Sequence, residues 1–285
     1  MTGEDHRRIL VIGIGAGDPD HVTLAAVRAM RDCEVFFLLD KGARVSELTR
    51  LRRNLVAEHA GPGHRVVRAE DPRRDRSPTG PAAYQARVVD WRHRRADLYE
   101  QLIRDELAPG RTGAFLVWGD PALYDSTIDA LEEVADRGAV PFTYDVIPGV
   151  SSVSVLAARH RTTLTRLGRP VRIAPGRHVA ASGLAEDEDV AVMLDVGAAL
   201  SAHHREEGWW MYWGAYVGTP EELLVSGPLA DVADRVLELR ATARERHGWI
   251  MDACLLRAES RAGAREAGGV EKPLRWRAAA GAPHC

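Results

Sequence analysis

Apolar positions in the first half of the chain fall into two alternating patterns. Short continuous apolar runs predict buried strands, and the longer segments between them have the spacing of helices with one buried face. The strands expected are 9–14, 35–39, 65–69, 114–118 and 142–147, and the helices are 23–32, 46–59, 82–107 and 126–137. Alternation of this kind is typical of a parallel sheet with helices on both faces.

The second half, which begins after a polar stretch at 159–168, has more strand-like segments for each helix. The strands expected are 171–174, 189–194, 209–217, 222–225 and 248–256, with one strong helix from Leu229 to about Arg246. This ratio favours a mixed sheet. We therefore expect an α/β protein of two domains, 7–162 and 163–258. The tail at 259–285 lacks apolar periodicity and is expected to be disordered.

The composition narrows the class of protein. The 285 residues, 45% of them hydrophobic, suffice for a sizeable core, and a net charge of −3 argues against nucleic-acid binding by bulk charge. No run approaches the roughly 18 apolar residues of a membrane span, and the N-terminus is polar rather than signal-like. The three cysteines are scattered without metal-ligand spacing, which favours a reduced cytoplasmic setting. We expect no membrane association and no bound metal.

Two of the predicted strands end in the same Gly-Asp-Pro signal. The first strand runs into Gly13-Ile14-Gly15-Ala16-Gly17-Asp18-Pro19, and the strand at 114–118 runs into Gly119-Asp120-Pro121. Ligands of open α/β sheets bind at the carboxyl ends of the strands. The recurrence of the signal therefore predicts one site shared by both turns.

A third predicted strand, 142–147, ends at Pro148-Gly149. Pro-Gly makes a turn, and Ser151 or Ser152 can cap the helix that follows. Capping is the simplest role for these serines. The start of the helix still leaves N–H groups for a ligand carboxylate or hydroxyl.

The glycines of the first turn also invite a dinucleotide-binding interpretation, and a tight turn without ligand is the simplest alternative. The dinucleotide fingerprint G-x-G-x-x-G needs an acidic residue about 20 residues on, a place that Asp40 could fill. The third glycine, however, comes one residue early. Asp18 would moreover repel a pyrophosphate. A dinucleotide-dependent oxidoreductase is therefore the minor interpretation.

Other catalytic arrangements find little support. Cys254 lies in an apolar strand and is expected to be buried rather than reactive. His203 and His204 are expected in a polar loop without metal-ligand spacing.

Taken together, these motifs resemble the tetrapyrrole (corrin and porphyrin) methylases over residues 8–257. The matching features, in chain order, are the first glycine-rich turn, Gly119-Asp120-Pro121-x-x-Tyr124, Ile147-Pro148-Gly149-x-Ser151-Ser152 and Thr219-Pro220-Glu221-Glu222. The resemblance implies a two-domain α/β fold that binds S-adenosylmethionine in the cleft between the domains. It also implies a tetrapyrrole substrate and a homodimer.

Five longer segments narrow the resemblance within this family: 35–42, 90–95, 117–127, 212–220 and 248–252. They are similar to members of the cobalamin pathway that methylate precorrin-5 at C-1 and release its acetyl group as acetate. The sequence departs from that pattern at Ala174-Pro175 and in its tail. The alternatives are another precorrin methylase of the same pathway and a tetrapyrrole carrier without activity.

The resemblance also implies roles for individual residues. The expected cofactor-binding residues are Gly119, Asp120, Leu123, Tyr124, Gly149, Ser151 and Ser152 from the first domain, and Met193, Leu194, Ala215, Tyr216 and Thr219 from the second. The residues expected to bind the substrate are Gly13, Gly15, Gly17 and Asp18, with Arg159, Arg161 and Arg166 as partners of its carboxylates. Loss of the acetyl group needs a base that activates water, for which we expect Asp120 first, then Asp18 and Tyr124.

Overall fold

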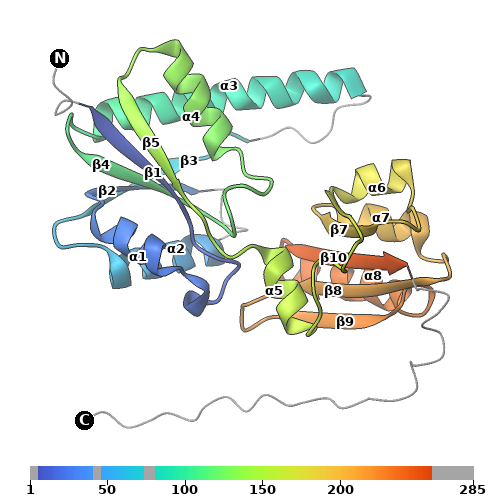
Figure 1. Ribbon diagram of the computed structural model, residues 1–285. Coiled ribbons are helices and arrows are strands. Elements are labelled where there is room, and N and C mark those ends of the chain that lie inside the picture. Colours follow the sequence, from blue (N-terminus) through green and yellow to red (C-terminus); the bar gives the residue numbers. More distant parts are fainter. Residues whose placement is uncertain (1–5, 41–45, 74–80, 259–285) are drawn as a thin grey trace, which may run out of the picture.

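The computed structural model describes residues 6–40, 46–73 and 81–258. Within these residues two five-stranded sheets lie one after the other along the chain, and helix α5 (Ser152–Arg159) sits between them (Figure 1). The tail predicted to be disordered lies outside the described residues. None of the helices in the described part of the chain is long and apolar enough to cross a membrane.

The first sheet is wholly parallel, with the strand order β3-β2-β4-β1-β5. Its strands are β1 (Arg7–Gly13), β2 (Val35–Asp40), β3 (Arg65–Glu70), β4 (Thr112–Val117) and β5 (Phe142–Ile147). Its helices are α1 (Leu24–Arg31), α2 (Ser46–His59), α3 (Pro81–Glu106) and α4 (Thr127–Arg137). The bounds of each of these elements were predicted to within two residues. Each element has an apolar pattern in the sequence that is followed by a turn or capping signal.

Helices cover both faces of this sheet. Side chains of α1 and α2 pack on one face, around Leu10 and Phe36 of the strands. Side chains of α3 and α4 pack on the other, around Val11 and Phe115. The connections that follow the adjacent strands β1 and β4 therefore lie on opposite faces. Such a point opens a crevice at the carboxyl ends of the two strands, and both Gly-Asp-Pro turns lie there.

The second sheet is mixed, as predicted, with the order β6-β7-β10-β8-β9. Strands β6 and β7 are parallel and the other pairs are antiparallel. The strands are β6 (Val171–Ala174), β7 (Asp189–Met193), β8 (Trp209–Ala215), β9 (Leu223–Pro228) and β10 (Asp252–Ala258). One face carries α6 (Gly176–Ser182), α7 (Val196–His203) and α8 (Leu229–His247), and α5 covers the other.

Three expectations for this half were wrong. Helices α6 and α7 are additional to the one strong helix expected, because α6 has only seven residues and α7 is apolar almost all round, so that neither shows a helical period. His203 is buried at the end of α7 rather than placed in a polar loop, and its Nε2 lies 3.1 Å from the carbonyl oxygen of Val179. Strand β10 begins at Asp252, not at residue 248, because Gly248 caps α8 with φ 74°.

Candidate active site at the junction of the two sheets

The two Gly-Asp-Pro turns are bonded to each other. The N–H of Gly119 donates to the carbonyl oxygen of Gly15 (2.8 Å), and the N–H of Gly15 donates to the carbonyl oxygen of Gly119 (3.2 Å). This two-residue antiparallel bridge confirms that both turns belong to one place in the fold. They form the floor of the crevice at the ends of β1 and β4.

The third turn packs against that floor with no room for a side chain. A Cβ atom on Gly149 would lie 2.1 Å from the carbonyl oxygen of Gly119, and one on Gly13 would lie 2.6 Å from the amide nitrogen of Gly149. Ser151 caps α5 through its Oγ, which accepts a hydrogen bond from the N–H of Ser154 (3.3 Å). The first turn of α5 therefore starts beside Gly119, and the N–H groups of Ser152 and Val153 remain available to an anion.

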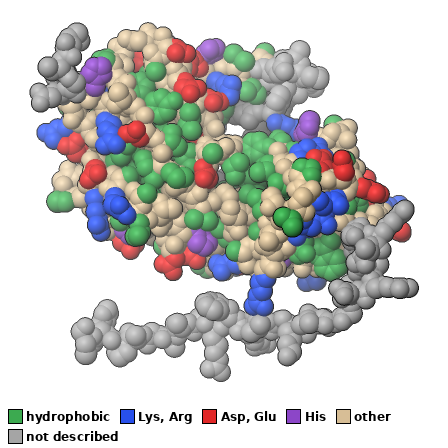
Figure 2. All heavy atoms as spheres, in the orientation of Figure 1, with side chains coloured by type: hydrophobic (Ala, Val, Ile, Leu, Met, Phe, Trp, Pro, Cys, Tyr) green, Lys and Arg blue, Asp and Glu red, His purple; other side chains and the backbone are tan. Residues whose placement is uncertain are grey.

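Side chains of both domains meet in an apolar cluster around α5. Its buried members include Ala16 of the first turn and Val217 of the second domain. Leu123 and Met193, both predicted to bind the cofactor, pack on its edge from opposite domains. Figure 2 shows hydrophobic side chains across the middle of one face of the molecule, with charged groups mostly around them.

Five non-glycine residues in the described part of the chain have positive φ angles. They are Tyr124, Arg161, Leu194, Asp195 and Tyr216, with φ between 50° and 62°. Four of the five were predicted as site residues, and Asp195 follows one of them. Each such residue costs about 1–3 kcal/mol of backbone strain, which clusters at functional sites. Leu194 is also 51% exposed, so an apolar side chain held in a strained conformation faces solvent.

The other predicted residues of the second domain lie deeper. The side chain of Ala215 is buried in the core of that domain, on the face of β8 that packs against helices. The Tyr216 hydroxyl donates to the carbonyl oxygen of Trp249 (2.6 Å). Thr219 lies at the domain junction, because its methyl group is 2.5 Å from where a Cβ of Gly17 would be. Only glycine at position 17 lets this turn reach the opposite domain.

A cavity of about 160 Å³ lies beside these contacts and is lined by both domains. Its walls are Gly17, Arg50, Leu51, Asn54, Trp118, Tyr216, Thr219, Pro220, Glu221, His247 and Trp249. Sequence reasoning predicted Gly17, Tyr216 and Thr219 but missed Trp118. The indole Nε1 of Trp118 is buried and has no acceptor among the described residues. The sequence signal that could have identified Trp118 is its position as the last residue of an apolar run, directly before Gly119.

A family profile with the description "Tetrapyrrole (Corrin/Porphyrin) Methylases" matches residues 8–233 of the chain. The chain belongs to the tetrapyrrole methylase family. Precorrin-6A synthase [deacetylating] of Sinorhizobium sp. is 45% identical to it over 258 residues, which cover 90% of this chain and 97% of the relative.

Two solved structures place this tetrapyrrole methylase among known folds. The crystal structure of a cobalamin synthesis related protein (CobF) from Corynebacterium diphtheriae is 33% identical and has a TM-score of 0.76, over 90% of this chain and 100% of that chain. Uroporphyrin-III C-methyl transferase from Thermus thermophilus, solved as a complex with S-adenosyl homocysteine, is 19% identical with a TM-score of 0.57. The match covers 88% of this chain and 97% of that chain, and it shows that the two proteins share a fold.

The three candidate bases of this tetrapyrrole methylase differ in their hydrogen bonds. Asp120 Oδ1 accepts from the N–H of Ala122 (2.8 Å), and no group among the described residues bonds to its Oδ2. Asp18 Oδ1 caps a short helical turn, and its Oδ2 lies 3.7 Å from the guanidinium of Arg159. The Tyr124 hydroxyl donates to a backbone carbonyl, and burial raises its pKa. Asp120 thus keeps an oxygen available for a water proton.

The three predicted arginines lie in different surroundings. Arg159 is at the junction, paired with Glu222 (3.0 Å) as well as with Asp18. Arg161 is exposed and carries a positive φ. Arg166 lies away from the junction, where its Nε donates to the buried Asp189 (3.0 Å). The structure therefore brings Arg159 to the glycine-rich turns and leaves Arg166 bonded inside the second domain.

The two cysteines within the described residues are poorly placed for chemistry. Cys33 and Cys254 are both buried, as was expected of Cys254. Burial raises the pKa of the Cys33 thiol to about 12 and that of Cys254 further. A thiol with so high a pKa is a poor nucleophile at neutral pH. Among the described residues no three His, Cys, Asp or Glu side chains gather as metal ligands would.

Proposed function

We propose that this tetrapyrrole methylase transfers a methyl group from S-adenosylmethionine to C-1 of precorrin-5 and releases the C-1 acetyl group as acetate, giving precorrin-6A. The proposal rests on 45% identity over almost the whole length of a precorrin-6A synthase. The structural observation that supports it is the convergence of the predicted cofactor segments of both domains at the β1–β4 crevice, with strained residues on both sides. We further propose a cytoplasmic homodimer that needs no membrane or nucleic acid.

The residues at the crevice fit the groups of S-adenosylmethionine. The first turn of α5 offers N–H groups suited to its carboxylate. Leu123, Met193 and Leu194 offer apolar surface for the adenine, and the close packing of Gly149 on Gly119 lets backbone groups approach the ligand. Asp120 and Tyr124 add polar groups that can fix orientation. When bound, the cofactor supplies an electrophilic methyl group.

Methyl transfer from a sulfonium makes few chemical demands on the protein, because charge is dispersed rather than created. The residues must mainly hold the macrocycle in line, and such orientation can contribute about 7–11 kcal/mol to lowering a barrier. The turns at Gly15 and Gly119 are hydrogen-bonded to each other and cannot shift independently. They are suited to presenting the ring and the methyl donor in a fixed relation.

Deacetylation makes a different demand, because water must attack the acetyl carbonyl. Asp120 is the base that the geometry favours, since its Oδ2 is available at the crevice. Arg50 and Asn54, one helical turn apart on α2, line the cavity next to Trp118 and could bind a carboxylate arm of the macrocycle. Arg159 and Arg161 are further candidates for the remaining arms.

Incubation with precorrin-5 and methyl-labelled S-adenosylmethionine, scored for methylation and for acetate, tests the proposal. We expect both products in equal amounts. Methylation without acetate would indicate another precorrin C-methyltransferase, and binding without turnover would indicate a carrier. Binding of NAD(H) in place of S-adenosylhomocysteine would favour the oxidoreductase. Asp120→Asn should abolish acetate release, with Asp20→Asn, an exposed neighbour of the first turn, as the control.

A further inference from the structure

A buried polar cluster lies beneath the loop that carries Tyr124. Its centre is Arg95 of α3, which is 5% exposed. Arg95 Nε lies 3.1 Å from Asp71 Oδ1, at the end of β3, and Nη2 donates to the hydroxyl of Tyr99 (2.6 Å). Nη1 donates to the hydroxyl of Ser126, the last residue of the loop before α4. One guanidinium thus joins a helix, a strand end and the loop.

Both the edge and the flat faces of the Arg95 guanidinium make contacts. The group also lies over the rings of Trp91 and Tyr99, 5.2 Å from each centroid. Burying a charge costs several kcal/mol even when it is paired, and a well-packed apolar residue is often as stable. Stability alone therefore does not account for an arginine here. A planar fork with two directed hydrogen bonds and an ion pair fixes its partners in place in a way that a point charge cannot.

The loop at 118–126 has two fixed ends. Gly119 is held by its bridge to Gly15. At the other end Ser126 is held by Arg95, and Thr127 Oγ1 lies 3.3 Å from the Tyr99 hydroxyl. Between these points the chain carries Tyr124 at φ 51°, a conformation that persists only where surrounding contacts impose it.

We propose that Arg95 is a positioning residue for the active site, which through Ser126 holds the 118–126 loop in the conformation that presents Asp120 and Tyr124 to the crevice. What the loop binds rests on the proposed function, whereas the bracing of the loop does not. The segments 90–95 and 117–127 are distant in the chain. In the structure they are in contact.

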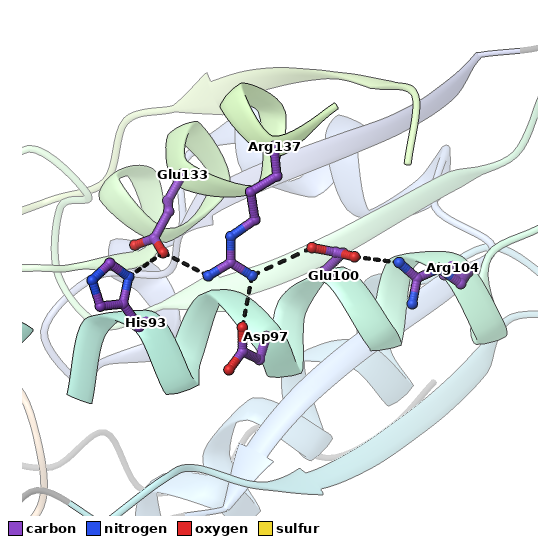
Figure 3. A network of polar contacts seen from close by, with 6 residues as sticks. All are labelled: His93, Asp97, Glu100, Arg104, Glu133 and Arg137. Atoms are coloured by element: carbon purple, nitrogen blue, oxygen red, sulfur yellow. Dashed lines mark hydrogen bonds and ion pairs between the residues drawn. The ribbon is translucent and has the colours of Figure 1, made fainter. Parts of the chain in front are cut away.

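Other contacts between α3 and α4 are of a different kind. Arg137 of α4 bonds to Asp97 and Glu100 of α3 and to Glu133 of its own helix (Figure 3). Arg92, close to Arg95 on the same helix, pairs with Asp129 of α4, and both of these side chains are about half exposed. These pairs join helix to helix and do not reach the loop. Arg92→Met is therefore a matched control for Arg95→Met.

Amide hydrogen exchange of the full-length protein tests the bracing directly. We expect Arg95→Met to raise exchange at 122–126 by at least about tenfold, because the loop loses a hydrogen bond from a charged group. Arg95→Lys should resemble Arg95→Met, because an ammonium keeps the charge near Asp71 but cannot reach Ser126 and Tyr99 together. Ser126→Ala removes the hydroxyl that accepts the hydrogen bond from Arg95 and keeps the arginine, so it should raise exchange at 122–126 severalfold. Arg92→Met should leave exchange there unchanged.

Titration with S-adenosylhomocysteine gives a second readout on the same variants. Its dissociation constant should rise on the order of tenfold in Arg95→Met and stay at the wild-type value in Arg92→Met. Unchanged exchange at 122–126 in Arg95→Met, equal changes in both variants, or wild-type behaviour of Arg95→Lys would overturn the proposal. If Arg95→Met does not fold, wild-type exchange in Ser126→Ala overturns it. Failure of the wild type to bind S-adenosylhomocysteine counts against the proposed function alone.

Discussion

The hydroxyl of Tyr124 donates a hydrogen bond to the backbone carbonyl of Ile173 across the junction, at 3.1 Å. Tyr124 belongs to the loop after β4 and Ile173 to β6, so this bond joins the two sheets. Burial raises the pKa of Tyr124, which keeps the hydroxyl protonated and able to donate.

Replacement of Tyr124 by Phe should weaken cofactor binding more than it weakens the fold. The ring remains, but the bond to Ile173 is lost, and a net contribution of about 0.5–1.5 kcal/mol corresponds to a roughly 2- to 12-fold weaker binding of S-adenosylhomocysteine. Calorimetric titration measures it. The control is Tyr144→Phe, which removes an exposed hydroxyl bond to Glu132 that joins β5 to α4 within the first domain. Equal affinity in both variants would show that the link to Ile173 is not used in binding.

Gly149→Ala should destabilise the protein strongly, by about 3 kcal/mol or more. The new methyl group would lie 2.1 Å from the carbonyl oxygen of Gly119, which is held by the bridge to Gly15. Gly168→Ala is the comparison, because nothing lies within 4 Å of its Cβ position and its φ of 72° adds only a left-handed penalty of about 1–2 kcal/mol. Denaturant unfolding at neutral pH measures both. A smaller loss in Gly149→Ala than in Gly168→Ala would refute the close packing of the turns.

The buried carboxylate of Asp189 should matter more for stability than either arginine that pairs with it. Its side chain is fully buried between Arg166 and Arg257, whose Nε atoms lie 3.0 Å and 3.2 Å away. Asp189→Ala leaves two cations without their partner and should cost about 3–5 kcal/mol. Arg166→Met leaves Arg257 in place and should cost less.

Arg166→Met also tests the substrate role predicted for Arg166. The variant keeps the Arg257–Asp189 pair, so we expect it to remain folded and its KM for precorrin-5 to be measurable. A KM at the wild-type value would confine Arg166 to the interior of the second domain. A raised KM with unchanged kcat would support a contact with a substrate carboxylate.

Stability should fall as the pH is lowered below about 6.5, in part because of His160. Burial lowers the pKa of His160 below its usual 6.5, although the bond between its Nε2 and the carbonyl of Trp213 (2.9 Å) opposes the shift. The unfolded chain therefore takes up this proton at a higher pH than the folded one. The stabilising effect is complete above pH 6.5 and is lost as the pH falls toward the folded pKa.

Unfolding free energies measured from pH 7.5 to 5 test this dependence. His160→Gln should show a shallower fall than the wild type, because one group that protonates preferentially in the unfolded state is gone. His178→Gln, at an exposed position on α6, should follow the wild-type curve. Parallel curves for all three proteins would show that His160 does not contribute.

Local signals predicted most of the fold and the meeting of the two Gly-Asp-Pro turns. The glycines and prolines of the two Gly-Asp-Pro turns are local signals that can be recognised in the sequence. Because the strands before them are parallel, their carboxyl ends are expected at the same edge of the sheet. The bonds that hold them together are long-range. The contact of Arg95 with Ser126 and the inward packing of Ala215 depend on register and topology, which the periodicity of single segments does not contain.

The strained residues at the junction carry a consequence for engineering of the protein. A residue at φ near 60° with an exposed side chain would be more stable as glycine, so Leu194→Gly should relieve backbone strain. A search for thermostable variants would therefore tend to select this change, which would remove a side chain from the crevice. Selection for heat resistance and selection for turnover should therefore favour different residues at position 194.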